Sequence, residues 1–186
     1  DTAPFSIAAS GETLVLSSPD GVLIDYFDTG VMNESNSVGR LSGDESGSRV
    51  FFTSSTIGKA NADAYFAAYT SEPQFSQLGG YTDKGTVVQI NCADESALIY
   101  YTINGDRPTT SSTLYADGVQ INESLPLRAI AVSADKLDSP IVTTNYLVEK
   151  QHDIAVLCIS GDEDDINYAY RVTEIFVKRE GEGHVE

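Results

Sequence analysis

The feature that most constrains the fold is a run of β-forming residues that ends in a turn. Residues 98–103 read Leu-Ile-Tyr-Tyr-Thr-Ile, and the pair Asn104-Gly105 follows them directly. Aromatic and β-branched residues favour extended strands, and Asn-Gly favours a turn with positive φ. A polar loop with one proline comes next. This pattern predicts a strand of an all-β module, and such a module is not usually a catalyst.

The composition indicates a folded protein with one large or two small domains. The chain has 186 residues, of which 41% are hydrophobic and 21% are charged. These values are typical of a packed core and not of a disordered chain.

The net charge of −17 is spread evenly along the chain. Residues 1–69, 70–148 and 149–186 contain 3, 4 and 4 basic residues against 9, 9 and 10 acidic ones, so their net charges are −6, −5 and −6. An acidic surface repels nucleic-acid phosphates and anionic lipid, which argues against both as partners. Cations and basic partners remain compatible with it, and plain solubility is the simpler interpretation. No apolar run approaches the roughly 18–20 residues of a membrane span, so membrane insertion is not expected.

The first part of the chain reads as four strands joined by turns. Strands are predicted in four runs, residues 13–16, 22–27, 38–41 and 49–53. The turn Ser18-Pro19-Asp20-Gly21 lies between the first two, and this predicts a hairpin. Four strands hardly bury a two-sheet core, so the sequence predicts an incomplete domain. Residues 62–69 suit either a short helix capped by Asn61 or an extended linker, and we favour the linker.

The second part of the chain is more regular. β-rich runs recur with turn signals between them, at residues 86–92, 98–103, 118–121, 127–132 and 141–148. This spacing is typical of a β-sandwich of immunoglobulin-like size. The chain has no Trp, so an antibody-type Cys–Trp–Cys pattern is absent. We therefore predict an all-β fold of tandem immunoglobulin- or fibronectin-III-like β-sandwiches, the first incomplete, with a short mixed C-terminal extension.

The extension, residues 149–186, differs in character. Residues 153–160 form an apolar run that could be a buried strand, and residues 172–177 are β-rich. The expected division is a partial sandwich at 1–61, a linker at 62–70, a complete sandwich at 71–148 and a lead-in to a further domain at 149–186.

Residues 71–148 resemble the small β-sandwich at the C-terminus of chitobiases and β-hexosaminidases. The resemblance rests on the order and spacing of five stretches, at residues 73–76, 79–81, 97–102, 104–109 and 112–115, and on Leu-Arg-Ala-Ile-Ala at 127–131. That family usually has Asp-Gly at the turn, where this chain has Asn104-Gly105. The resemblance implies an appendage that does not supply catalytic carboxylates.

Two flanking segments resemble other families found in bacterial surface proteins. Residues 5–61 are similar to the second half of a bacterial lamin-tail-type domain, on the stretches at 5–7, 10–16, 19–21, 37–40 and 56–61. The earlier strands of that family have no counterpart here, so either the fragment is truncated or a companion chain supplies them. Residues 151–186 resemble the entrance to a CotH-type kinase domain, on His-Asp-Ile-Ala-Val-Leu at 152–157, the acidic stretch and residues 179–186. No catalytic residue carries over.

Three tyrosines are the candidate ligand-binding residues. Tyr100 and Tyr101 are adjacent in a predicted strand, so their rings point to opposite faces. One would be buried with a tethered hydroxyl, and the other would be free to stack on a sugar ring. Tyr115 could add to such a platform. The alternative is that these tyrosines are purely structural.

The acidic run Asp162, Glu163, Asp164 and Asp165 is the candidate metal site. Hard cations such as Ca²⁺ take six to eight oxygen ligands, which clustered carboxylates can supply. The EF-hand spacing is absent, and a solvated loop is the alternative. Apart from this possible Ca²⁺, no cofactor is predicted.

Other chemistry has little support in the sequence. His152 and His184 are the two histidines, and no Gly-x-Ser-x-Gly or phosphate-binding loop accompanies them. Acidic pairs for glycoside hydrolysis occur throughout so acidic a chain, and their presence decides nothing. Cys92 and Cys158 could form a disulfide in an oxidising compartment, or could each be a small buried apolar residue.

The sequence therefore predicts a non-catalytic structural or spacer module of an exported bacterial protein, located at the cell surface or outside the cell. The 15 Gly, 10 Tyr and absence of Trp suit an exported chain. The partners expected are carbohydrate or another surface protein. The alternatives are a carbohydrate-binding module and an accessory part of a CotH-type kinase.

Overall fold

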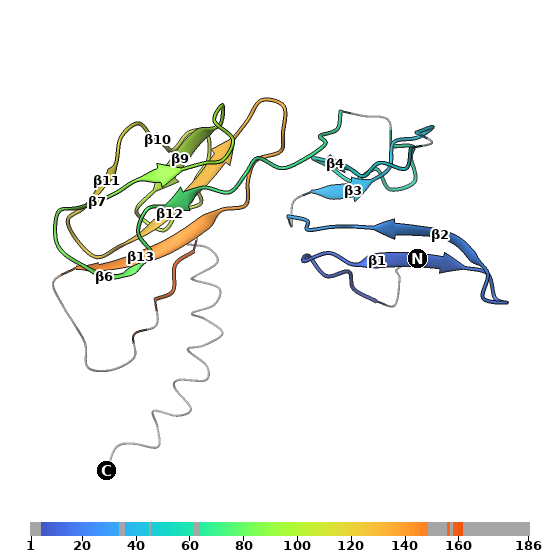
Figure 1. Ribbon diagram of the computed structural model, residues 1–186, viewed down its shortest axis with the longest axis horizontal. Helices are drawn as coiled ribbons and strands as arrows, with labels where there is room; N and C mark the ends of the chain where they lie inside the picture. Colours follow the sequence, from blue (N-terminus) through green and yellow to red (C-terminus); the bar gives the residue numbers. More distant parts are fainter. Residues whose placement is uncertain are drawn as a thin grey trace, which may run out of the picture. The chain divides into compact units, whose positions relative to one another are not determined.

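The computed structural model describes residues 5–33, 36–44, 46–61, 64–148, 156 and 158–161 (Figure 1). Within these residues the chain forms strands β1 to β13 and no helix, so the all-β prediction is confirmed. The chain divides into two compact units. Unit 1 comprises Asp1–Tyr69 with Ala134–Leu137, and unit 2 comprises Thr70–Ser133 with Asp138–Glu186.

Unit 1 contains two small antiparallel sheets. Strands β1 (Thr13–Ser17) and β2 (Leu23–Asp28) form one, and β3 (Ser37–Gly39) and β4 (Val50–Phe52) form the other. The predicted hairpin is present. The Ser18 N–H donates to the Val22 carbonyl at 2.9 Å, and Gly21 has a φ of +85°. Glycine is needed there because other residues rarely adopt positive φ.

The core of unit 1 is small and centres on β4. Its buried hydrophobic residues within the described part of the chain are Val50, Phe51, Phe52 and Leu137. Three consecutive residues of β4 are buried, so both faces of this strand are covered. The ring of Tyr69 lies 4.6 Å from that of Phe51, between ring centroids. This core is small for a unit with two sheets.

The segment before unit 2 is extended. Phe66 forms an isolated antiparallel bridge with Phe51, with 2.9 Å hydrogen bonds in both directions between their N–H and carbonyl groups. Residues 64–69 contain no helical turn, so the extended alternative holds for them. Residues 62 and 63 lie outside the described part of the chain.

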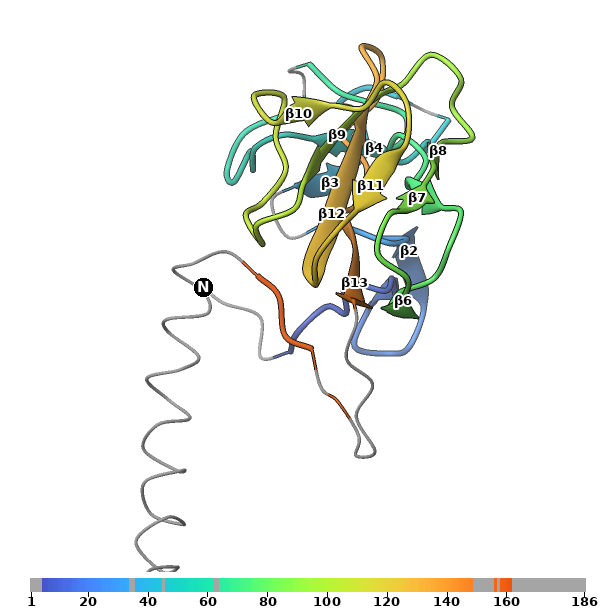
Figure 2. The ribbon, with the colours of Figure 1, turned by 90° about the vertical axis from the view of Figure 1, so that its left-hand side faces the viewer.

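Unit 2 is built on a five-stranded sheet of order β10-β9-β12-β13-β6. Its strands are β6 (Gly80–Thr82), β9 (Leu98–Thr102), β10 (Thr113–Leu114), β12 (Leu125–Val132) and β13 (Val142–Val148). Figures 1 and 2 show the long strand β12 between β9 and β13. Neighbouring strands are antiparallel except β13 and β6, which are parallel.

A second layer covers one face of this sheet. It contains the pair β7 (Thr86–Val88) with β11 (Val119–Ile121) and the pair β5 (Gln74–Phe75) with β8 (Ile90–Asn91). One core cluster takes alternate residues of both layers, namely Val88, Ile90, Val119 and Ile121 against Ile99, Leu125, Leu127, Ala129, Ala131, Tyr146 and Val148. Alternation is expected because successive side chains of a strand point to opposite faces. Unit 2 is therefore a β-sandwich.

Two features of unit 2 differ from the sequence prediction. The predicted strand at 86–92 is divided at Gln89, because β7 pairs with β11 whereas β8 pairs with β5. Ser76 holds this break, since its N–H donates to the Gln89 carbonyl and its hydroxyl accepts from the Gln89 N–H. The short strands β5, β6 and β10 were not predicted, because runs of two or three residues carry no readable alternation.

The apolar run at 153–160 lies mostly outside the described residues. Its described members, Val156 and residues 158–160, include no strand, and Val156 and Ile159 are exposed. The expectation of a buried strand is therefore wrong for these positions.

Candidate functional site

Tyr100 and Tyr101 point to opposite faces of the five-stranded sheet, as alternation requires. Tyr101 pairs with Ala129 and packs against the core cluster beside the buried Ile99. Tyr100 pairs with Leu114 on one side and with Ile130 on the other. Since directly paired residues share a face, Tyr100 lies on the face away from the core.

Tyr115 belongs to the core side and its hydroxyl is fully engaged. The ring packs against the core cluster. The hydroxyl donates to Gln89 Oε1 at 2.7 Å and accepts from the N–H groups of Ile90 and Gly118 at 3.1 and 3.2 Å. Tyr115 thus ties the second layer together, and it does not join Tyr100 in a common platform.

The buried tyrosine with a tethered hydroxyl is Tyr146, which the sequence did not single out. Its side chain is fully buried, and its hydroxyl donates to the Gln77 carbonyl at 2.7 Å. Burial raises the pKa of this phenol above its ordinary value. The signal that could have identified it is its place inside the predicted strand at 141–148, two positions before the buried Val148.

Tyr100 lies in an apolar patch, which we call the outer patch. Its members come from β9, β10 and β12, and they are Leu98, Tyr100, Leu114, Ile130 and Val132. Leu98 and Leu114 are 52% and 50% exposed, Tyr100 and Val132 are half-buried, and Ile130 is buried, so the exposed part of the patch lies on β9 and β10. An exposed apolar surface with one aromatic ring is the arrangement that a sugar ring or a protein side chain can stack upon.

The loop after β9 borders the outer patch with polar groups. The Thr102 hydroxyl donates to the Asp106 carbonyl at 2.7 Å, and Arg128 donates to the carbonyl of Gly105. Gly105 has a φ of +95°, as the Asn-Gly pair predicts. However, β9 and β10 pair only from Tyr101 and Thr113 onward, so this turn opens a long loop and not a two-residue hairpin.

The predicted metal site, Asp162 to Asp165, lies outside the described residues, as do His152 and His184. Within the described ranges, no three His, Cys, Asp or Glu side chains gather as metal ligands would. No helix among these residues is long and apolar enough to cross a membrane.

The two cysteines are not paired. Cys92 is half-buried and lies 3.2 Å from the carbonyl oxygen of Ser71, whereas Cys158 is exposed. The alternative of two small buried apolar residues therefore describes Cys92 in part and does not describe Cys158.

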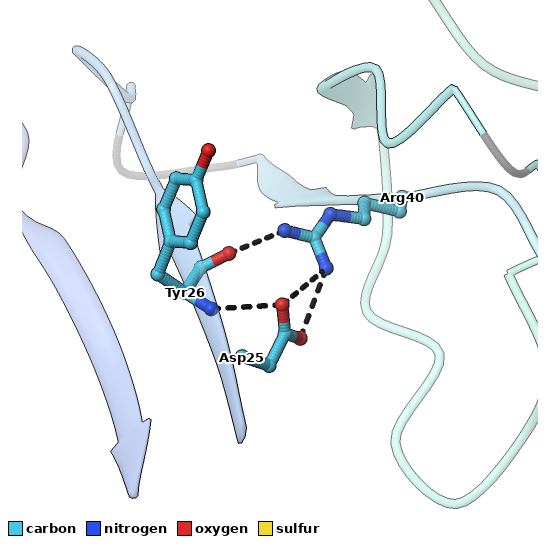
Figure 3. Close-up of polar contacts among 3 residues, drawn as sticks. All are labelled: Asp25, Tyr26 and Arg40. Atoms are coloured by element: carbon cyan, nitrogen blue, oxygen red, sulfur yellow. Dashed lines mark hydrogen bonds and ion pairs between the residues drawn. The ribbon is translucent and has the colours of Figure 1, made fainter. Parts of the chain in front are cut away.

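Unit 1 contains a charged cluster that the sequence did not reveal (Figure 3). Arg40, just after β3, contacts both carboxylate oxygens of Asp25 at 3.0 and 2.9 Å and donates to the Tyr26 carbonyl. Its guanidinium also lies over the Phe27 ring at 5.3 Å. The hydrogen bond from Arg40, followed by that from the Tyr26 N–H, holds the pKa of Asp25 below its ordinary value.

The Arg40 cluster joins separate elements of unit 1. The Arg40 side chain bonds to Asp25 and Tyr26 of β2, and the carbonyl of Arg40 accepts from the Asn61 side chain at 2.9 Å. The cluster therefore fastens β2 to β3 and to the loop at Asn61. Asp25, Arg40 and Asn61 are far apart in the sequence, and no sequence motif predicts a contact among them.

Comparison with known protein families gives one match. Residues 77–144 match the family of the chitobiase/beta-hexosaminidase C-terminal domain. The match covers β6 to β12 and the first three residues of β13, which is most of the five-stranded sheet and most of the second layer. This domain is a non-catalytic accessory β-sandwich. Comparison with curated proteins gave no match, and comparison with solved structures gave none.

Proposed function

We propose that the chain is a non-catalytic spacer and contact module of an exported bacterial surface protein. The observation that carries this proposal is the match of residues 77–144 to an accessory domain. A structural role also suits Tyr115 and Tyr146, because their rings pack in the core and their hydroxyls bond to other residues of unit 2. Such a module would space or orient a neighbouring domain outside the cell.

The flanking segments support a three-part arrangement. Unit 1, with its two small sheets, suits an incomplete lamin-tail-type domain. Residues 151–186 resemble the entrance to a CotH-type kinase domain, and this order of segments is typical of bacterial surface proteins. In this arrangement unit 2 is the middle spacer.

Two measurements test this proposal. The purified chain should hydrolyse neither ATP nor chromogenic glycosides of N-acetylglucosamine, and measurable turnover of either would overturn the proposal. In the source bacterium, an externally added protease should remove an epitope tag inserted in the loop after β9. Complete protection of the tag in intact cells would contradict a surface location.

The outer patch favours carbohydrate binding as a second function. Tyr100 is the aromatic ring of the patch, and Leu98 and Leu114 flank it with exposed apolar surface. Sugar rings stack on such surfaces through their C–H faces, and the polar loop after β9 could contact sugar hydroxyls.

Affinity electrophoresis in gels that contain chitin derivatives, peptidoglycan fragments or plant polysaccharides tests this function. Retardation by one glycan should largely disappear in Tyr100→Ala and persist in Tyr65→Ala, which removes a 51% exposed tyrosine of unit 1. Equal mobility of the native chain in all gels would exclude carbohydrate binding and leave the spacer role intact.

A further inference from the structure

The β1–β2 hairpin of unit 1 exposes apolar side chains on both of its faces. The exposed fractions are 64% for Val15, 57% for Leu16, 57% for Leu23, 61% for Ile24 and 60% for Tyr26. Val15 and Tyr26 are direct partners on one face, whereas Leu16 projects from the other. A two-stranded sheet with this much exposed apolar surface is marginal in water, and additional strands normally stabilise such a sheet.

The free edge of β1 offers unpaired backbone groups. The Thr29 N–H donates to the Glu12 carbonyl, and the Ser18 N–H donates to the Val22 carbonyl. Backbone groups alternate in direction along a strand, so Thr13, Val15 and Ser17 direct their N–H and carbonyl groups away from β2. Among the described residues, β1 pairs only with β2. An uncovered edge of this kind is a template for another strand.

The residues of β1 are symmetric in chemical type about Val15. The strand reads Thr13-Leu14-Val15-Leu16-Ser17. If a second copy of β1 pairs antiparallel with Val15 opposite Val15, then Leu14 faces Leu16 and Thr13 faces Ser17. Each hydroxyl meets a hydroxyl and each aliphatic side chain meets an aliphatic one, so this register is self-complementary.

The charges next to β1 also fit a second copy. The strand itself has no charged residue, although the chain carries −17. In the register centred on Val15, Glu12 faces Ser18 of the second copy and Asp20 faces Ser10. Like charges directly opposite one another would be unfavourable, and here each flanking acid faces an uncharged residue.

We propose that two copies of this chain associate through antiparallel pairing of their β1 strands about a two-fold axis at Val15. The result is a four-stranded sheet of order β2-β1-β1-β2 that joins the two copies. On one face, the two Val15 side chains lie between the two Tyr26 rings and form a continuous apolar row. The contact is isologous, as in most symmetric dimers.

Sedimentation velocity over a range of protein concentrations tests the association. The native chain should show a reversible monomer–dimer equilibrium. Val15→Lys should raise the dimer dissociation constant more than tenfold, because the two-fold axis places the two ammonium groups side by side. The matched control is Val87→Lys on β7, which adds the same charge at a 53% exposed strand position of unit 2 and should leave the equilibrium unchanged.

A crosslinking experiment tests which residues of the two β1 strands face each other. An equimolar mixture of Thr13→Cys and Ser17→Cys chains, each in a Cys158→Ser background, should form a mixed disulfide dimer under mild oxidation. The facing Cα atoms of such a pair lie about 5.5 Å apart, within the range that a disulfide spans. Each variant alone should crosslink far less. Equal crosslinking of all three samples would overturn the register.

Salt dependence separates a second copy from a basic partner. Both copies are acidic, so association should strengthen as NaCl is raised from 20 to 300 mM and repulsion is screened. A native chain that remains monomeric up to about 0.5 mM protein in 300 mM NaCl, with normal circular dichroism, would overturn the proposal. The β1 edge would then be free to accept a strand from a different protein.

Discussion

At the scale of single residues, the Arg40 side chain fastens β2 to the chain just after β3. Arg40→Met keeps the aliphatic stem but removes the ion pair with Asp25, the hydrogen bond to the Tyr26 carbonyl and the stacking on Phe27. We expect a loss of about 1–2 kcal/mol of stability, mainly from the charged hydrogen bond to the backbone. Urea unfolding measures the loss, and hydrogen exchange should locate it in β2 and β3.

Asp25→Asn is the informative companion to Arg40→Met. It removes the carboxylate but leaves Arg40 its bond to the Tyr26 carbonyl. Exposed ion pairs contribute little to stability, and the Asp25 side chain is 53% exposed. The aspartate variant should therefore be clearly more stable than the arginine variant. The reverse order would show that the ion pair, and not the backbone contact, fastens β2.

Tyr146 provides a prediction about alkaline pH. Burial raises its pKa above the ordinary value of 10.0, so the folded chain holds this proton more tightly than the unfolded chain. The contribution of this proton to the free energy of unfolding is fully present below pH 10 and is lost as the pH rises through the folded-state pKa. Tyr146→Phe should cost about 1 kcal/mol at pH 7, because the Gln77 carbonyl loses its donor. Above pH 10, its stability should fall less steeply than that of the native chain, and parallel curves would contradict this account.

At the scale of elements, two separate features make glycine necessary at position 105, its positive φ and the space around it. Gly105 has a φ of +95°, and a Cβ there would lie 3.3 Å from the Gly161 carbonyl oxygen. Gly85, with a φ of +87°, has only the Gln120 side-chain nitrogen nearby, at 4.0 Å. The two glycines thus differ in packing but have nearly the same φ.

Alanine substitution separates the two causes. Gly85→Ala should cost about 1 kcal/mol from backbone strain alone. Gly105→Ala should cost more, because the chain at Gly161 must also shift. Chemical unfolding of both variants measures the difference. Equal losses would mean that the contact with Gly161 contributes nothing to the stability of unit 2.

The elements that sequence reasoning found are those that bury an alternating row of side chains. The strand predicted at 127–132 is the C-terminal part of β12, in which Leu127, Ala129 and Ala131 are fully buried. The division of residues 86–92 into β7 and β8 was missed. That division depends on which strands lie alongside, β11 and β5, and no local pattern encodes the choice of neighbour.

At the scale of the whole molecule, the net charge of −17 should make stability depend on salt. Evenly spread like charges repel one another more in the compact state than in the unfolded chain. We expect the melting temperature at pH 7 to rise by about 2–4 °C between 10 and 200 mM NaCl, which for a chain of this size corresponds to roughly 1 kcal/mol. An unchanged melting temperature would mean that local ion pairs such as Arg40–Asp25 offset the repulsion.

The sequence by itself determined the all-β class, the hairpin at 13–28 and the alternating strands of the second part of the chain. These properties follow from local signals, because alternation, turn glycines and β-forming residues act within a few positions. The sequence also determined that Tyr100 and Tyr101 face opposite ways. It did not determine which of the two faces the core.

Only the tertiary structure decided which tyrosine lies in the outer patch, and why. The face of the sheet that carries Ile99, Ala129 and Ala131 packs against the second layer. Tyr101 lies on that face, so Tyr100 lies on the other. The Arg40 cluster likewise forms only once β2 and the residues after β3 lie side by side. Local chemistry specifies a strand, whereas the side that is buried and the edge that remains open depend on the strands that lie beside it.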